Sequence, residues 1–221
     1  MPREQFQREL DELRDEVLAM GEAVVSRLRK ALAALDARDA DRARSLAERD
    51  HEINEWYLRL ERRCVDLLAL QQPVAGDLRL VVASFKIITD LERIADLVAN
   101  ICGYLLSRER ELFPDVNLQD LGKLTVEMVE ASLAAYARED ADTCYAVADR
   151  DDELDGLCER VGERVVRDLV EFDPDGRDEL LFGEVNRFLL TVRDLERVGD
   201  HAVNIAARTL YMVENDDALI Y

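Results

Sequence analysis

The chain has 221 residues, and its 29 lysines and arginines stand against 49 aspartates and glutamates, so the formal net charge is −20. Hydrophobic residues make up 48% and charged residues 35% of the chain, which is typical of a folded globular protein rather than a disordered one. A charge this negative argues against binding to nucleic-acid phosphates or to anionic lipid, because both need clustered lysine and arginine. The 9 glycines and 4 prolines are few for a protein rich in turns, and they favour long helices.

No targeting or membrane-spanning segment is expected. The first residues, Met1–Gln5, become charged at once and lack the apolar segment of a secretory signal. No apolar run approaches the about 20 residues that a membrane span needs. We therefore expect a cytoplasmic protein.

The 4 cysteines are expected to be small core residues. They have no short metal-type spacing, and each lies in a helical pattern beside apolar neighbours, which is typical of buried free thiols rather than disulfides or thiolate ligands. They are Cys64, Cys102, Cys144 and Cys158.

Apolar residues that recur by threes and fours predict three helices in the first half of the chain. The first runs from Phe6 to Leu35, and the polar residues 36–41 turn the chain. The second helix is predicted over 40–70, before Pro73 and Gly76, and the third over 77–106. Residues 107–117 are charged and contain a proline, so they are the best candidate for a linker.

The same pattern then starts again. Helices are predicted over 118–137, from the turn at 140–142 to about residue 171, and over 178–214, with Pro174 and Gly176 between the last two. The second half therefore has the same order of elements as the first.

Short identical stretches show that this second half is a repeat. Asp39-Ala40-Asp41 recurs as Asp140-Ala141-Asp142, 101 residues later, and Asp90-Leu91-Glu92-Arg93 recurs as Asp194-Leu195-Glu196-Arg197, 104 residues later. The two offsets agree if the second copy has extra residues in the loop after Pro174, where insertion is tolerated. We predict an all-α fold of two tandem, similar three-helix bundles with six long helices, the first over 1–110 and the second over 115–221.

Carboxylates occupy positions that the apolar pattern assigns to the core. They are found in the second and third helices of each unit, and each has a polar residue one turn further on, which points the same way from the helix. The pairs are Asp50 with Asn54, Glu92 with Asp96, Asp151 with Asp155, and Glu196 with Asp200. Like charges at this spacing destabilise a helix by about 0.2–0.5 kcal/mol, and a partly buried unpaired carboxylate costs more, so we expect a compensating cation.

Two kinds of cation are compatible with the sequence. One is an arginine, but Arg93 and Arg197 directly follow the glutamates, and neighbouring residues on a helix diverge, so both are expected to face solvent. The other is a metal ion held between two helices, as in carboxylate-bridged bundles. An oxygen-dominated ligand set suits magnesium, manganese, calcium or iron better than copper or a thiolate zinc centre.

Other polar residues near these pairs are expected to be structural. His51 and His201 each sit beside an aspartate rather than one turn away, so they are predicted to be exposed helix residues rather than ligands. Asn100 and Asn204 extend the carboxylate rows by another turn and are predicted to pack between helices rather than to act as outer ligands.

Several of these stretches resemble the PhoU family of phosphate-transport accessory and regulatory proteins. The resemblance is carried by Leu91–Asp96 and Leu195–Ala206, and it extends to Gln72–Arg79 before the third helix and to Tyr211–Glu214 near the end. It covers essentially the whole chain, including its length and its duplication, and the short motifs are specific when taken together.

The resemblance implies two similar three-helix bundles with multinuclear metal clusters of iron, manganese, magnesium or zinc. The implied ligands are Asp50, Asn54, Glu92 and Asp96 in the first unit and Asp151, Asp155, Glu196 and Asp200 in the second. Asn54 departs from the pattern, because an acidic residue would be expected there, so the first site has one charge fewer than the second.

The resemblance also implies a negative regulator that couples the phosphate ABC transporter, through its ATPase subunit, to a sensor histidine kinase. The residues themselves show no nucleophile–base pair, phosphate-cradling glycine loop or Rossmann turn, so we expect no enzyme. Two alternatives are a di-metal carboxylate oxidase, whose typical Glu-x-x-His pairs are missing here, and a metal-free helical scaffold. The apolar helix seams favour a homodimer.

Overall fold

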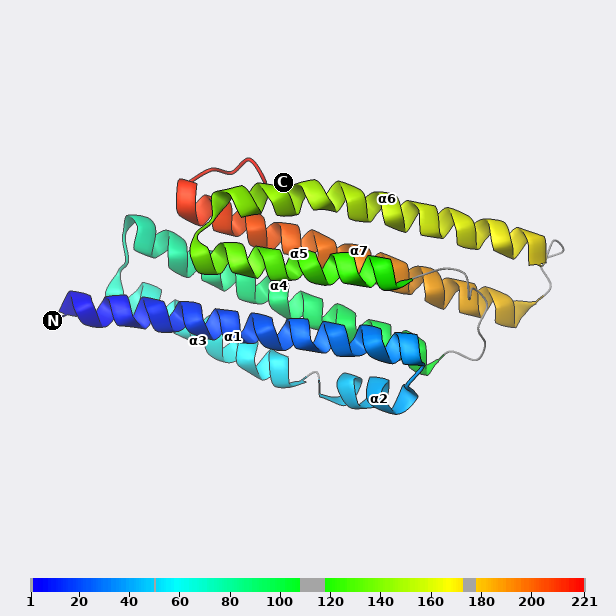
Figure 1. Ribbon diagram of the computed structural model, residues 1–221. Helices are drawn as coiled ribbons and strands as arrows, with labels where there is room; N and C mark the ends of the chain where they lie inside the picture. Colours follow the sequence, from blue (N-terminus) through cyan, green and yellow to red (C-terminus); the bar gives the residue numbers. More distant parts are fainter. Residues whose placement is uncertain (1, 50, 108–117, 173–177, 221) are drawn as a thin grey trace.

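The computed structural model describes residues 2–49, 51–107, 118–172 and 178–220. Within them the chain forms seven α-helices: α1 (Pro2–Ala37), α2 (Ala40–Glu48), α3 (His51–Gln71), α4 (Ala75–Leu106), α5 (Leu118–Arg138), α6 (Ala141–Phe172) and α7 (Glu179–Glu214). The first four form one bundle, in which α2 and α3 together take the place of the second helix, and the last three form the other (Figure 1). The prediction of an all-α fold with two tandem three-helix bundles is confirmed. The predicted division between the units, at 110–115, lies outside the described residues and stays a prediction.

The second helix of the first unit is split, which corrects the prediction of one helix over 40–70. The guanidinium of Arg27 on α1 donates a hydrogen bond to the carbonyl oxygen of Leu46 at 3.1 Å, and His51 Nδ1 lies 3.2 Å from the carbonyl oxygen of Glu48. Side chains that engage the last carbonyls of a helix favour its ending there. Met128, 101 residues after Arg27, has no such donor, and α6 is unbroken.

The turns that begin the second helix of each unit are alike. Arg38 and Glu139, at the ends of α1 and α5, both have a φ of 54°. Asp39 and Asp140 then accept hydrogen bonds from backbone N–H groups three residues further on, at 2.9 and 3.2 Å. Such carboxylates cap the start of a helix. The repeat in the sequence is therefore also a repeat in backbone conformation.

The two units pack through α1 against α5 and through α4 against α7 (Figure 1). A Cβ atom on Gly21 would lie 2.6 Å from Leu133, and one on Gly122 would lie 2.7 Å from Leu32. The two glycines are 101 residues apart, as are the two leucines. The same contact is thus made twice, once from each unit, and it allows α1 and α5 to approach closely.

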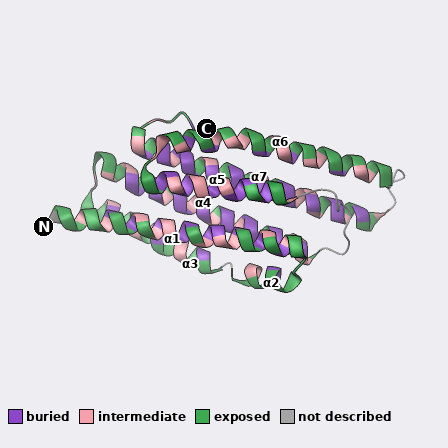
Figure 2. Cartoon of the chain, viewed as in Figure 1, coloured by how far each residue is buried: buried purple, intermediate pink, exposed green. Residues whose placement is uncertain are grey.

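The core fills the space between the helices, and their outer faces are exposed (Figure 2). The four cysteines are buried and free, which confirms their predicted place. Burial raises the pKa of the Cys64 and Cys158 thiols to about 12 and that of the Cys102 and Cys144 thiols to about 11. Measured against the length and apolar composition of a membrane span, every helix that the structure describes falls short.

Candidate functional site

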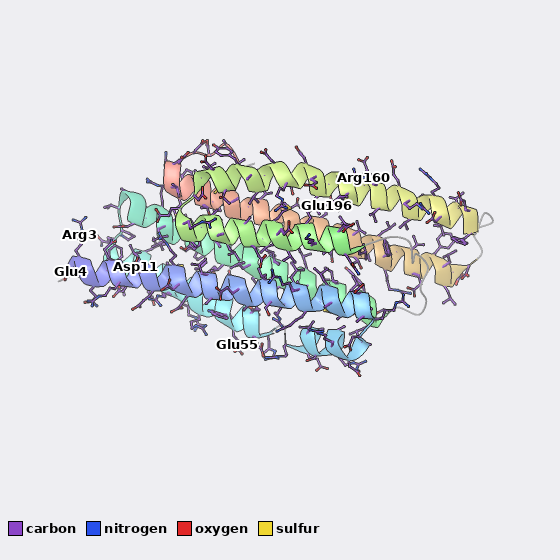
Figure 3. The ribbon with its side chains drawn as sticks, viewed as in Figure 1. Arg3, Glu4, Asp11, Glu55, Arg160 and Glu196 are labelled. Carbon is purple, nitrogen blue, oxygen red and sulfur yellow. The ribbon has the colours of Figure 1, made fainter. Side chains whose placement is uncertain are left out.

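The carboxylates of the second unit lie where α6 and α7 pack against each other. A Cβ atom on Gly199 would collide with Leu154 and would lie 3.4 Å from Asp151 Oδ1, so the glycine allows the close approach of the two helices. This approach brings Asp151 and Asp155 of α6 into the electrostatic range of Glu196 and Asp200 of α7. Figure 3 marks Glu196 on α7, between the ribbons of α5 and α6.

These four carboxylates repel one another in a partly buried setting. Burial, followed by the charges of Asp155, Asp200 and other carboxylates nearby, raises the pKa of Asp151 to about 6. Burial and neighbouring carboxylates also raise the pKa of Glu196 and of Asp200. Asp151 Oδ1 is buried and has no hydrogen-bond partner among the described residues. An oxygen in this position is a ready ligand for a cation, because its negative charge is otherwise uncompensated.

The donor set fits a hard cation, although the side chains do not yet converge on one point. Within the part of the chain that the structure describes, no group of three Asp, Glu, His or Cys side chains stands ready to hold a metal ion. Asp155 is exposed, so it is free of the packing constraints of a core side chain. Four carboxylates supply only oxygen ligands, which suit magnesium, calcium, manganese or iron.

The corresponding residues of the first unit are arranged differently. Asp50 lies outside the described residues, and Asn54 is exposed on α3. Glu92 and Asp96 on α4 are both approached by the guanidinium of Arg93, at 3.5 and 3.2 Å. Arg93 is 56% exposed, as predicted, but it also pairs with these two carboxylates.

Arg27 is a second arginine that bears on the candidate site of the first unit, and the sequence analysis did not single it out. Its guanidinium is partly buried and bonds to Leu46 O. A hydrogen bond from Arg49 lowers the pKa of Glu52, and the charge of Arg27 adds to this effect. In the second unit the equivalent Met128 lies 3.6 Å from the place of a Cβ on Gly199, beside Asp151. Comparing positions 27 and 128 of the repeat would have revealed the difference.

A polar contact between α4 and α7 corrects the prediction for one histidine. His201 Nδ1 lies 2.9 Å from Asp90 Oδ1, and the two side chains are only 18% and 14% exposed. Asn204 is exposed, but it donates to the same oxygen at 3.4 Å and so still links the two helices. His201 is covered because α4 packs on this side of α7. His51 is exposed, as predicted, and Asn100 is exposed, contrary to its predicted packing role.

Asp194, the repeat equivalent of Asp90, makes a second link between α4 and α7. Its side chain is fully buried and accepts a hydrogen bond from the Tyr104 hydroxyl at 3.1 Å. The guanidinium groups of Arg193 and Arg197 lie 3.4 and 3.7 Å from its Oδ1. Arg197 is therefore engaged by Asp194, whereas Arg93 is engaged by the candidate ligands of its own unit.

Two tandem helical bundles with paired carboxylates at a helix interface define a duplicated all-helical protein of the binding or regulatory class. The model of the PhoU domain matches residues 17–105 and again residues 118–209. The chain therefore belongs to the PhoU family, as its sequence motifs suggested. The family comprises non-enzymatic regulatory and accessory proteins of phosphate transport, which argues against the oxidase alternative.

Relatives and solved structures agree over almost the whole chain. The phosphate-specific transport system accessory protein PhoU of Edwardsiella tarda is 34% identical over 215 residues, which cover 96% of this chain and 86% of that protein. The crystal structure of the phosphate transport system regulatory protein PhoU from Streptococcus pneumoniae has a TM-score of 0.87 and 28% identity, with 96% of this chain and 98% of that chain covered. For PhoU from Pseudomonas aeruginosa the TM-score is 0.84 and the identity 33%, with coverage of 96% and 100%.

Proposed function

We propose that this chain is a metal-binding regulatory adaptor of phosphate uptake that negatively regulates the phosphate-starvation response. It would act in the cytoplasm and couple the ATPase subunit of the phosphate ABC transporter to a sensor histidine kinase. Membership of the PhoU family over both halves of the chain supports the regulatory role.

A single observation supports the metal-binding part of this proposal most directly. Asp151 Oδ1 is buried without a hydrogen-bond partner among the described residues, and the charges of Asp155, Glu196 and Asp200 act on it. A divalent cation such as manganese, magnesium, iron or zinc would neutralise this repulsion, with these four carboxylates as its ligands. Because the ligands come from α6 and α7, the bound ion would also hold the two helices together.

Deletion of the gene tests the regulatory role. In phosphate-rich medium the deletion strain should transcribe its phosphate-response genes, and a plasmid copy of the wild-type chain should silence them again. A copy with Asp151→Asn and Glu196→Gln tests whether the carboxylates contribute, and Asp142→Asn, an exposed carboxylate elsewhere on α6, is the matched control. Phosphate-response genes that stay silent after deletion would contradict the regulatory role.

Metal analysis tests the site. Purified wild-type chain should bind manganese, and Glu196→Ala combined with Asp200→Ala should abolish this binding. Stoichiometric binding that survives the double substitution would show that the ligands lie elsewhere.

We also propose that two copies of the chain form a homodimer. Large apolar side chains are exposed where the second helix of each unit ends. They are Leu70 and Val74, at the end of α3 and just after it, and Val170 and Phe172 at the end of α6. Such side chains are common at contacts between subunits. Sedimentation equilibrium should give twice the 25.2 kDa mass of one chain, whereas a single-chain mass at micromolar concentration would exclude the dimer.

A further inference from the structure

The two candidate sites differ in residues around an otherwise repeated motif. Asn54 stands where the second unit has Asp155, and Arg27 stands where it has Met128. Arg93 contacts Glu92 and Asp96, whereas its counterpart in the second unit contacts Asp194. The first two differences make the first unit more positive, and the third directs a charge that both units carry toward the candidate ligands in the first unit only.

We propose that only the second unit takes up a metal ion, and that Arg27 and Arg93 supply the compensating positive charge in the first unit. This inference rests on the proposed metal-binding function and specifies which half of the chain performs it.

Arg27 is held at the place where the second helix of the first unit breaks. Its Nη2 donates to the carbonyl oxygen of Leu46, at the end of α2, and its charge acts on Glu52, at the start of α3. In the second unit the equivalent Met128 lies against Gly199 next to Asp151, so in that unit the position is beside the carboxylate of the second helix. A guanidinium there is a permanent charge, because arginine does not lose its proton in proteins.

Arg93 adds a second positive charge to the same unit. It lies within 3.5 Å of Glu92 and 3.2 Å of Asp96, the two first-unit candidates on α4. A cation at this place would have to displace the guanidinium from both carboxylates. It would also find the neutral amide of Asn54 where the second unit offers a carboxylate. Repulsion by two guanidinium groups and the loss of one charged ligand both weaken binding of a divalent ion.

The second unit lacks the charge of Arg27. Its Arg197 is the counterpart of Arg93, and the charge of Arg197 opposes the rise in the pKa of Asp200. Met128 is apolar, and the buried carboxylate of Asp194 draws Arg197 to itself at 3.7 Å. Among the described residues, no lysine or arginine forms an ion pair with Asp151, Asp155 or Glu196. The second unit therefore has four carboxylates available for a metal ion, whereas the charge of the first-unit carboxylates is already compensated by arginine.

Titration of the metal-stripped full-length chain with Mn²⁺, followed by calorimetry and by metal analysis after gel filtration, tests the inference. Glu92→Gln in the first unit should leave the number of bound ions and their Kd unchanged. The matched Glu196→Gln in the second unit should weaken binding by about ten-fold or more, because it removes a direct ligand. If Glu92→Gln lowers the stoichiometry as Glu196→Gln does, both units bind metal and the inference is wrong. If the wild-type chain binds no Mn²⁺, or Glu196→Gln has no effect, the proposed metal-binding function itself fails.

A gain-of-site variant tests the role of the arginine. Arg27→Met combined with Asn54→Asp gives the first unit the residues of the second at these two positions, and it should bind additional Mn²⁺. Adding Glu92→Gln to this variant should remove the gain. Circular dichroism checks that the variant is folded, and no additional Mn²⁺ in a folded variant would overturn the role of Arg27. If the variant does not fold, the comparison of Glu92→Gln with Glu196→Gln still decides whether the first unit binds metal.

Discussion

The two units share their helices and most of their motif, but they compensate the charge of their carboxylates differently. In the first unit Arg93 contacts Glu92 and Asp96, and Arg27 reaches the end of α2. In the second unit burial and mutual repulsion raise the pKa of Asp151 to about 6, and its Oδ1 has no partner among the described residues. A repeated backbone can therefore carry two different electrostatic environments.

The contacts that hold the units together are, by contrast, symmetric. Gly21 of α1 faces Leu133 of α5, and Gly122 of α5 faces Leu32 of α1. Each unit therefore contributes one glycine and one leucine to the same kind of contact. Helix packing depends on the side-chain volume at a few facing positions, whereas the charge of a site depends on individual charged side chains. One substitution can therefore change the charge of a site while the packing of its helices stays the same.

The largest expected effect is stabilisation by metal. If, as proposed, the ion binds only the folded α6–α7 pair, Mn²⁺ at about 1,000 times its Kd should raise the free energy of unfolding by about 4 kcal/mol. Thermal melts with and without Mn²⁺ measure the change. Asp151→Asn should remove most of the rise in Tm, and Arg93→Gln should leave the rise unchanged. A rise that survives Asp151→Asn but is lost in Arg93→Gln would mean that the metal binds in the first unit instead.

A larger residue at Gly199 should destabilise the second unit. Gly199→Val places a side chain against Leu154 and Asp151 and should lower the free energy of unfolding by about 1–3 kcal/mol, as overpacked helix contacts do. Urea denaturation gives the value. Gly103→Ala, at a helical glycine where the added Cβ would lie within 4 Å of no other helix, is the control and should not destabilise the chain. Equal losses for the two variants would mean that the close approach of α6 and α7 is unimportant.

Stability of the metal-free chain should depend on pH through Asp151. Its pKa is raised from 3.8 to about 6 in the folded state, so between these values the folded chain binds more protons than the unfolded chain. This contribution is full below about pH 4 and is lost as the pH rises through 6. Urea denaturation at pH 5 and pH 7 should show a smaller pH effect for Asp151→Asn than for the wild type. Metal binding has the opposite dependence and should weaken below pH 6, since protons compete for the same oxygens.

The smallest effect is expected at Arg93. The side chain is 56% exposed, and exposed ion pairs contribute about 0–1 kcal/mol. Arg93→Gln should therefore shift the urea midpoint only slightly and leave the m-value unchanged. A loss of several kcal/mol would show that the first unit depends on this ion pair far more than its exposure suggests.

Most of the fold could be predicted from the sequence, because the period of the apolar residues sets the helices and the repeated motifs set their order. The break between α2 and α3 could not, since Arg49 and His51 carry no glycine or proline signal and the contact comes from Arg27 on α1. The burial of His201 was missed for a similar reason. It results from the packing of α4 of the first unit against α7 of the second, which the sequence pattern of α7 alone does not contain.

The sequence by itself determined the helical class, the duplication, the family and the eight candidate ligand positions, because these follow from local periodicity and from repeated residues. Only the tertiary structure decided which charges meet. It placed Arg93 against Glu92 and Asp96, turned Arg197 toward Asp194, and left Asp151 Oδ1 without a partner among the described residues. The physical reason is that electrostatic compensation depends on distances of a few ångströms between side chains, often on different helices, and spacing along one helix does not contain that information.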